Sequence, residues 1–151
     1  KNLLSLSCQI NFRRTTNARQ CYFKNHMGPE AKLYKKVKKS FTGFSLNRLE
    51  NSSLLGTPDI LGYNSSGHFF TIELKVTSGN KIRFSPHQIA FHVRHPHNTF
   101  IIAEALGPSN KKLIYMYSGA RILELDACGL KLEPLCLSLD ACSLMLNQLG
   151  A

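Results

Sequence analysis

The sequence predicts an α/β (α+β) fold in which helices flank a central mixed sheet of about five strands. Segments with helical and strand periodicity follow one another along the chain in the order helix, three strands, helix, two strands, helix. Hydrophobic residues make up 43% of the 151 residues and charged residues 19%, which is enough apolar material for a core. This length is typical of one domain, and we expect residues 28–151 to form it.

The first helix is predicted to begin at Gly28-Pro29, because proline is favoured at the first helical position. Leu33, Val37 and Phe41 recur every four residues and form one apolar stripe. The other faces of this helix carry the lysines Lys32, Lys35, Lys36, Lys38 and Lys39.

Strands are predicted where hydrophobic and polar residues alternate. In chain order they cover residues 44–49, 58–63, 68–77, 99–105 and 112–117. The turn residues Asn-Ser-Ser-Gly at 64–67 join the second and third strands into a hairpin. A second helix is predicted from Ser85-Pro86. A last helix is predicted from Pro134, with the near-helical spacing of Leu135, Leu139, Cys142 and Leu146.

The third predicted strand carries the residues with the most informative chemistry. Glu73 and Lys75 are two residues apart, so a strand presents both on one face. The antiparallel hairpin can bring Asp59 beside Glu73, and two adjacent carboxylates repel each other unless a cation lies between them. Carboxylate oxygens suit Mg²⁺ or Mn²⁺, which also bind phosphates. With Lys75 to hold or deprotonate water, or to stabilise the transition state, such a group can hydrolyse a phosphodiester.

Pro58-Asp59, followed 14 residues later by Glu73-Leu74-Lys75, resembles the motif of the PD-(D/E)XK nuclease superfamily. The resemblance covers about residues 28–117 and includes an acid on the preceding helix and a glutamine on the following one. Residues 56–92 are most similar to the virus-type replication-repair nucleases and to Holliday-junction-resolvase-like members.

The resemblance implies a restriction-endonuclease-like core and a role for each matching residue. Asp59 and Glu73 would be metal ligands, Glu30 would complete the metal shell, and the Leu74 carbonyl would be a further ligand. Lys75 would be the catalytic lysine. The glutamine that many members place near this lysine or the substrate phosphate would be Gln88.

These implications predict a DNA endonuclease that depends on Mg²⁺ (or Mn²⁺) and hydrolyses phosphodiester bonds. We expect it to select branched, junction or flap DNA in replication, recombination or repair. Two alternatives are a sequence-specific restriction-type enzyme and a catalytically inactive nucleic-acid-binding module of the same fold.

Each site residue also has a purely structural interpretation. An acid such as Glu30 is favoured in any first helical turn. Gln88 stands three residues after Ser85, which is the spacing of a capping box. Asp59 can shape a turn, and Glu73 with Lys75 can lie on a solvated sheet face.

The charge distribution indicates a polyanionic partner. Lys and Arg number 19 against 9 acids, a formal net charge of +10, and residues 1–50 carry +9 of it. We therefore expect DNA, branched or duplex, as the partner, and no membrane. The expected phosphate contacts are Lys32, Lys35, Lys36, Lys39, Arg48, Lys81 and Arg83. Resolvases of this kind act as dimers, and residues 130–149 are a candidate interface for a homodimer or a cap on the sheet.

Three histidines and one later acid are not assigned to the site. His92, His95 and His97 cluster around Pro96, which breaks helical geometry, so we expect a surface or DNA-facing loop and not a zinc site. Glu104, on a later strand, is expected to make a structural ion pair.

Residues 1–26 contain no acid and are interpreted as a basic, flexible extension. A flexible arm, an organelle transit segment and an extension upstream of Met27 remain open alternatives. No apolar run approaches the roughly 20 residues of a membrane span. The five cysteines form no CxxC pair and are expected to be free thiols in a reducing compartment. We therefore expect an intracellular protein, cytoplasmic or nucleoid-associated, or in the host cytoplasm if viral.

Overall fold

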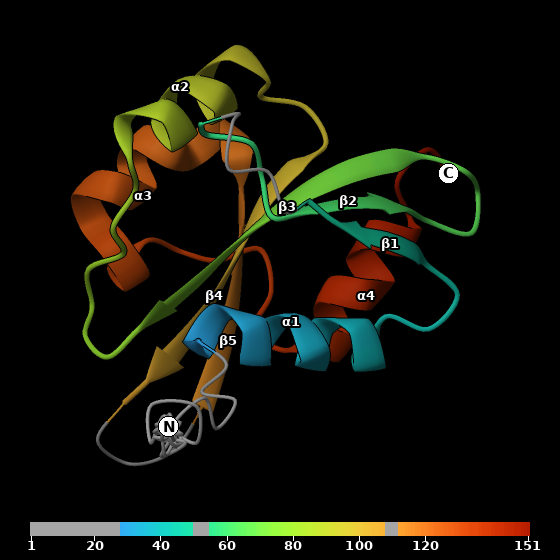
Figure 1. Cartoon of the computed structure of the whole chain (residues 1–151), viewed down its shortest axis with the longest axis horizontal. Coiled ribbons are helices and arrows are strands. Elements are labelled where there is room, and N and C mark those ends of the chain that lie inside the picture. Colours follow the sequence, from blue (N-terminus) through green and yellow to red (C-terminus); the bar gives the residue numbers. More distant parts are fainter. Residues whose placement is uncertain (1–27, 50–54, 108–111) are drawn as a thin grey trace, which may run out of the picture.

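The computed structural model describes residues 28–49, 55–107 and 112–151 of the chain. The predicted extension, residues 1–26, and residues 51–54 of the loop before the second strand lie outside them. The fold is α+β, with a five-stranded mixed sheet and four helices, and this confirms the predicted class (Figure 1). The elements are α1 (Pro29–Ser40), β1 (Ser45–Arg48), β2 (Ile60–Tyr63), β3 (Phe69–Thr77), α2 (Pro86–Arg94), β4 (Thr99–Leu106), β5 (Lys112–Ser118), α3 (Ile122–Cys128) and α4 (Leu139–Asn147).

The strands lie in the sheet in chain order, β1-β2-β3-β4-β5. All neighbouring pairs are antiparallel except β3 and β4, which are parallel and are connected through α2. The longest strand, β3, is therefore central and is paired on both sides. Each residue of β3 is held in position by two neighbouring strands and by the helices that pack on the sheet.

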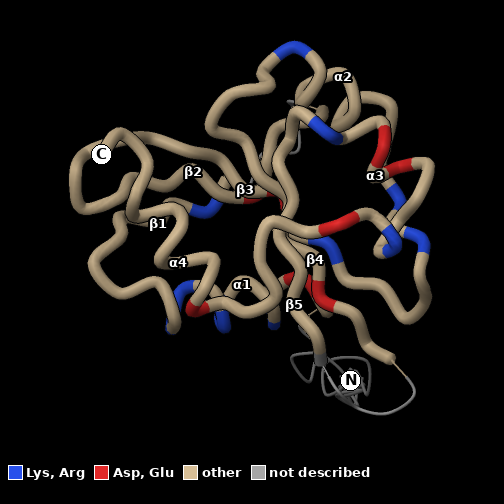
Figure 2. Tube along the Cα trace, turned by 180° about the vertical axis from the view of Figure 1, so that it is seen from behind, with Lys and Arg blue, Asp and Glu red and all other residues tan. Residues whose placement is uncertain are grey.

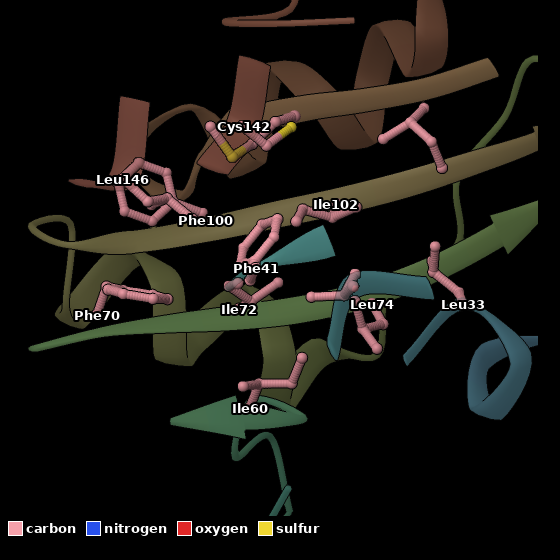
Figure 3. Packing of buried hydrophobic residues seen from close by; sticks show 13 residues of the cluster. Leu33, Phe41, Ile60, Phe70, Ile72, Leu74, Phe100, Ile102, Cys142 and Leu146 are labelled. Carbon is pink, nitrogen blue, oxygen red and sulfur yellow. The ribbon is translucent and has the colours of Figure 1, made fainter. Parts of the chain in front are cut away.

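Helices cover both faces of this sheet, α1 and α4 on one side and α2 and α3 on the other (Figure 1). On the first side, Leu33 of α1 and Cys142 and Leu146 of α4 meet the inward residues of β2, β3 and β4 (Figure 3). On the second side, Ile122 and Leu125 of α3 form another buried cluster with residues of β4 and β5. The result is a three-layer domain in which residues 70–74 of β3 are buried, while Phe69 at the start of the strand is exposed.

The covered second face changes the interpretation of Glu73. A solvated sheet face was one explanation for Glu73 and Lys75, and the structure contradicts it. Glu73 is 2% exposed, and the Lys75 side chain is 14% exposed. An acid is rarely buried to this extent unless it is paired. The groups that contact the Glu73 carboxylate therefore indicate why it is buried.

The last helix begins later than its sequence pattern predicts. Leu135 lies in a bend and Cys136 forms a β-bridge with Met116 of β5, with hydrogen bonds from Leu135 N–H to Met116 O at 2.7 Å and from Met116 N–H to Cys136 O at 3.0 Å. The helix starts only at Leu139, where the Ser138 side chain accepts from Ala141 N–H as an N-cap. Leu135 has helical spacing by coincidence. The prediction missed α3 altogether, because its seven residues are too few to show a clear period.

Two further observations concern the role of residues 130–149 and the possibility of a membrane span. Cys142 and Leu146 are fully buried under the sheet, which is the capping role proposed for residues 130–149. Every helix in the described segments falls short of the length and hydrophobicity that a membrane span requires.

Glu104 of β4 makes the structural ion pair that was predicted for it. Its carboxylate is 3% exposed and binds the Lys36 ammonium group of α1. Lys36 is therefore committed to the domain's own stability, and its predicted role as a phosphate contact becomes secondary.

We expect Lys36→Met to lower the free energy of unfolding by about 1–2 kcal/mol, because a buried carboxylate loses its partner while water reaches only part of it. Urea unfolding of the purified chain measures the change. Lys35→Met, on an exposed position of the same helix, is the matched control and should leave stability nearly unchanged. Equal effects of the two substitutions would contradict the assignment.

Candidate functional site

The hairpin of β2 and β3 places Asp59 beside the backbone of β3. Ile60 pairs with Ile72, so Asp59, one residue earlier, lies opposite Glu73 in the antiparallel register. The Leu74 N–H donates to Asp59 Oδ2 at 2.7 Å. The Asp59 carbonyl accepts from Leu49 N–H at 2.8 Å, which fixes the backbone at this point. The proximity of Asp59 and Glu73, predicted from sequence, is thus present in the structure.

Glu73, Lys75 and Gln88 form a closed group of three side chains. Lys75 Nζ lies 3.0 Å from Glu73 Oε1 and donates to Gln88 Oε1 at 3.1 Å. The Gln88 amide nitrogen in turn donates to Glu73 Oε1. The ammonium group also lies 5.6 Å from the centre of the Phe84 ring. Lys75 is therefore held in one position by contacts on several sides.

Gln88 also has the structural role that was weighed against its functional one. Its Oε1 accepts from Ser85 N–H at 3.0 Å, and its own N–H donates to Ser85 Oγ at 3.2 Å, which together form a capping box at the start of α2. The same amide contacts Lys75 and Glu73. The two interpretations are compatible, because the cap fixes the rotamer that points the amide at the site.

Both carboxylates resist ionisation in this environment. Burial raises the pKa of Glu73 to about 7, and the nearby charge of Asp59 adds to the rise, against the opposing effect of Lys75. Burial likewise raises the pKa of Asp59, although the hydrogen bond from Leu74 and the charge of Lys75 oppose it. Two carboxylates that oppose each other's ionisation in this way favour the binding of a cation between them.

Glu30 lies at the edge of this site and outside its buried part. It is exposed in the first turn of α1, where its charge contributes to the raised pKa of Glu73. With Lys75 it lines a cavity of about 500 Å³, which Lys81 and Arg83 of the loop after β3 also line. The structure therefore places two of the predicted phosphate contacts next to the predicted catalytic lysine.

The other predicted phosphate contacts lie around α1. Lys32, Lys35 and Lys39 are exposed on this helix, and basic positions recur along it (Figure 2). Arg48 of β1 is exposed and its guanidinium lies 5.3 Å from the centre of the Tyr34 ring. Basic residues are therefore exposed on α1 and β1, in addition to those that line the cavity.

His92 corrects a prediction. It was assigned to a surface loop with His95 and His97; those two are exposed, whereas His92 is 1% exposed on the buried side of α2. Neither ring nitrogen has a hydrogen-bond partner within the described part of the chain. Burial and the charge of Lys75 lower the pKa of His92 to about 4, so the ring is neutral at physiological pH. Its spacing of four from Gln88 was the signal that both lie on one helix face.

Gly119 explains how a histidine fits in this position. A Cβ atom at Gly119 would lie 2.5 Å from His92 Nδ1 and 2.9 Å from the Thr99 Cβ. The residue after β5 must therefore be glycine if α2 is to lie this close to the sheet. The close approach of α2 is what allows Gln88 to reach Lys75.

The donor set of the site fits a divalent cation with oxygen ligands. One oxygen of each carboxylate is held by the described chain: Asp59 Oδ2 accepts from Leu74 N–H, and Glu73 Oε1 is contacted by Lys75 and Gln88. Carboxylate oxygens at such a position suit Mg²⁺ or Mn²⁺. Among residues 28–49, 55–107 and 112–151, however, no three Asp, Glu, His or Cys side chains lie together as a metal site. Glu30 is thus not gathered with Asp59 and Glu73 into the predicted set of three.

Comparison with known proteins provides no assignment: no protein-family model matches the chain, and no curated protein matches it. The functional argument therefore depends on the geometry and chemistry of the site itself.

Proposed function

We propose that the chain is a Mg²⁺- (or Mn²⁺-) dependent DNA endonuclease of the PD-(D/E)XK type. The observation that carries this proposal is the closed group of Glu73, Lys75 and Gln88 beside Asp59. A lysine held at fixed distances next to two carboxylates that resist ionisation, at the wall of an open basic cavity, is suited to phosphodiester hydrolysis. A domain that needed these residues only for stability would gain more from apolar side chains at the same positions.

Each residue of the group has a distinct role in this proposal. Asp59 and Glu73 hold the cation, with the Leu74 carbonyl as a further ligand, and the bound cation supplies charge stabilisation to the scissile phosphate. The Lys75 ammonium group donates hydrogen bonds to the attacking water or to a phosphate oxygen as negative charge develops there. Gln88 keeps Lys75 in line with the reacting atoms.

The substrate in this proposal is a DNA backbone bound chiefly through phosphates. Lys81 and Arg83 line the cavity that contains Lys75, and the lysines of α1 continue the basic surface. Contacts of this kind position a strand and carry no sequence information. They favour an enzyme that selects DNA by structure, such as a junction or flap, and they predict binding that weakens steeply with salt.

The test is cleavage of junction, flap, duplex and single-stranded DNA by the full chain, with Mg²⁺ or Mn²⁺ and with EDTA. Glu73→Gln should lower the cleavage rate by a factor of at least about 10², because it removes one of two cation-binding carboxylates. Glu104→Gln is the matched control, since Glu104 is equally buried in the neighbouring strand and is also paired with a lysine, but belongs to the opposite face of the sheet.

Cleavage that persists in Glu73→Gln, or that is lost equally in both variants, would contradict the proposal. Binding of all four DNAs without any cleavage in either metal would instead favour the inactive nucleic-acid-binding module. Cutting of duplex at one fixed sequence, with junctions ignored, would favour a restriction-type enzyme.

A further inference from the structure

A second cavity lies at the other end of α2 from the candidate site. Its volume is about 410 Å³, and it is lined by Phe69 and Thr71 of β3, by Phe91 and Arg94 of α2, and by the turn that follows α2. The lower end of the range for small-molecule sites is about 300 Å³. The cavity is therefore large enough for one planar heterocycle and too small for an extended chain.

Aromatic rings form the walls of this cavity. Phe69 is 49% exposed and its ring centre lies 6.5 Å from that of Tyr63, itself 40% exposed on β2. Opposite, the rings of Phe91 and His95 lie 4.8 Å apart between centres. Exposed aromatic side chains of this kind are the platforms on which unpaired bases stack.

The charge and the polar groups of the cavity also favour a nucleic acid. Arg94, His95 and His97 line it, and the described residues of the lining include no Asp or Glu. Thr71, which is 7% exposed, belongs to the lining and carries a hydroxyl group with no hydrogen-bond partner in the described chain. A buried hydroxyl without a partner is uncommon.

The cavity and the candidate site share one face of β3. Phe69, Thr71, Glu73 and Lys75 alternate with core residues and so point to the same side of the sheet. Strand geometry places Thr71 roughly 13 Å and Phe69 roughly 20 Å from Lys75, at about 3.3 Å per residue. A DNA strand advances about 3.4 Å per nucleotide in a duplex, so the cavity lies within about six nucleotides of a phosphate bound at Lys75.

We propose that this cavity binds one unpaired base of the DNA strand, stacked on Phe69, within about six nucleotides of the phosphate that is cut. Arg94 and the two histidines contact the adjoining backbone. The inference depends on the proposed nuclease function for the identity of the strand, and it adds the reason for selecting branched DNA: only a strand with an unpaired base reaches both places.

The test measures binding by the full chain in EDTA, so that it does not depend on cleavage. The probes are a flap DNA and the fully paired duplex of the same length, each with a fluorescent label. Wild type should bind the flap more tightly, and Phe69→Ala should weaken flap binding about tenfold, the loss expected for one base stack, while duplex binding changes less than about twofold. Leu113→Ala on β5, 47% exposed against 49% for Phe69, is the matched control and should change neither.

Two further measurements locate the base and guard against misfolding. With 2-aminopurine at successive positions of the flap, fluorescence should be quenched at one position in wild type and recover there in Phe69→Ala. Arg94→Gln, a substitution of an exposed side chain, should weaken flap binding as well, and thermal unfolding verifies that each variant is folded. Equal affinity of wild type for flap and duplex, or equal effects of Phe69→Ala and Leu113→Ala, would overturn the inference. Failure of the proposed nuclease function would show instead as absent cleavage by wild type in Mg²⁺.

Discussion

Replacing Lys75 by Met should lower kcat for DNA cleavage by about 10²–10³-fold, the loss that follows removal of one preorganised donor to developing negative charge. The affinity for DNA should change much less, because the Lys75 side chain is only 14% exposed and its ammonium group is held by Glu73 and Gln88. Methionine has a similar length and keeps the packing against Phe84. The measurement is single-turnover cleavage at saturating enzyme, together with the Kd in EDTA.

Lys81 is the matched control for this substitution. It lines the same cavity as Lys75 but is exposed, and no acid contacts it in the described chain. Lys81→Met should therefore weaken DNA binding and reduce its salt dependence, with kcat nearly unchanged. If the two substitutions changed kcat and Kd in the same proportions, Lys75 would be one more phosphate contact and the catalytic role would be wrong.

Gln88 acts through Lys75 and is a positioning residue, since its amide contacts the lysine and Glu73. It also closes the cap of α2 with Ser85. Gln88→Glu keeps an acceptor for Ser85 N–H and for Lys75 but loses the donor to Glu73, and a third acid then faces the two carboxylates. The pH at which cleavage reaches half of its maximum should shift upward, which a loss of the cap alone would not produce.

The central part of the site could be predicted because local rules determine it. Alternation along β3 places Glu73 and Lys75 on one face, and the turn at 64–67 fixes the register that brings Asp59 beside them. The capping box of Ser85 and Gln88 is likewise a local pattern. None of these features depends on how distant segments pack.

The residues that were misplaced depend on tertiary packing. His92 is buried because α2 lies close to the sheet, and that distance is set by Gly119, 27 positions later in the chain. Leu135 is not helical because its N–H donates to Met116 O and the next residue, Cys136, bridges to β5, which overrides its helical spacing. Glu30 was predicted to complete the metal shell, but it is exposed on α1 and is not gathered with Asp59 and Glu73 among the described residues. The spacing of residues along one helix does not show which of them the sheet covers.

The buried pair of Glu73 and His92 should give the metal-free protein two opposite dependences of stability on pH. The pKa of Glu73 rises from 4.5 to about 7 on folding, so its carboxyl favours the folded state below pH 4.5, and this contribution is lost as the pH rises to about 7. The pKa of His92 falls from 6.5 to about 4, so its contribution is complete above pH 6.5 and is lost as the pH falls to about 4. Between these limits the two effects oppose each other in wild type.

Substitution of either residue should therefore leave only the dependence of stability on pH that the other residue causes. Across this range the free energy of unfolding of Glu73→Gln should fall, relative to wild type, as the pH is lowered from 7 to 4.5. That of His92→Gln should rise relative to wild type as the pH is lowered from 6.5 to 4. Each pKa unit corresponds to about 1.36 kcal/mol, so each relative change should approach 3 kcal/mol at most. Urea unfolding in EDTA at pH 4.5, 5.5, 6.5 and 7.5 measures both.

The sign of the two changes distinguishes this explanation from a general loss of packing. A cavity or a lost hydrogen bond lowers stability by a similar amount at every pH, so the curves of variant and wild type would run parallel. Ile101→Val provides that comparison, because Ile101 is fully buried, pairs with Glu73 in the sheet register and carries no ionisable group. Parallel curves for Glu73→Gln as well would mean that its carboxyl ionises as readily in the folded chain as in the unfolded one. The candidate site would then lack the repulsion between Asp59 and Glu73 that favours a cation there.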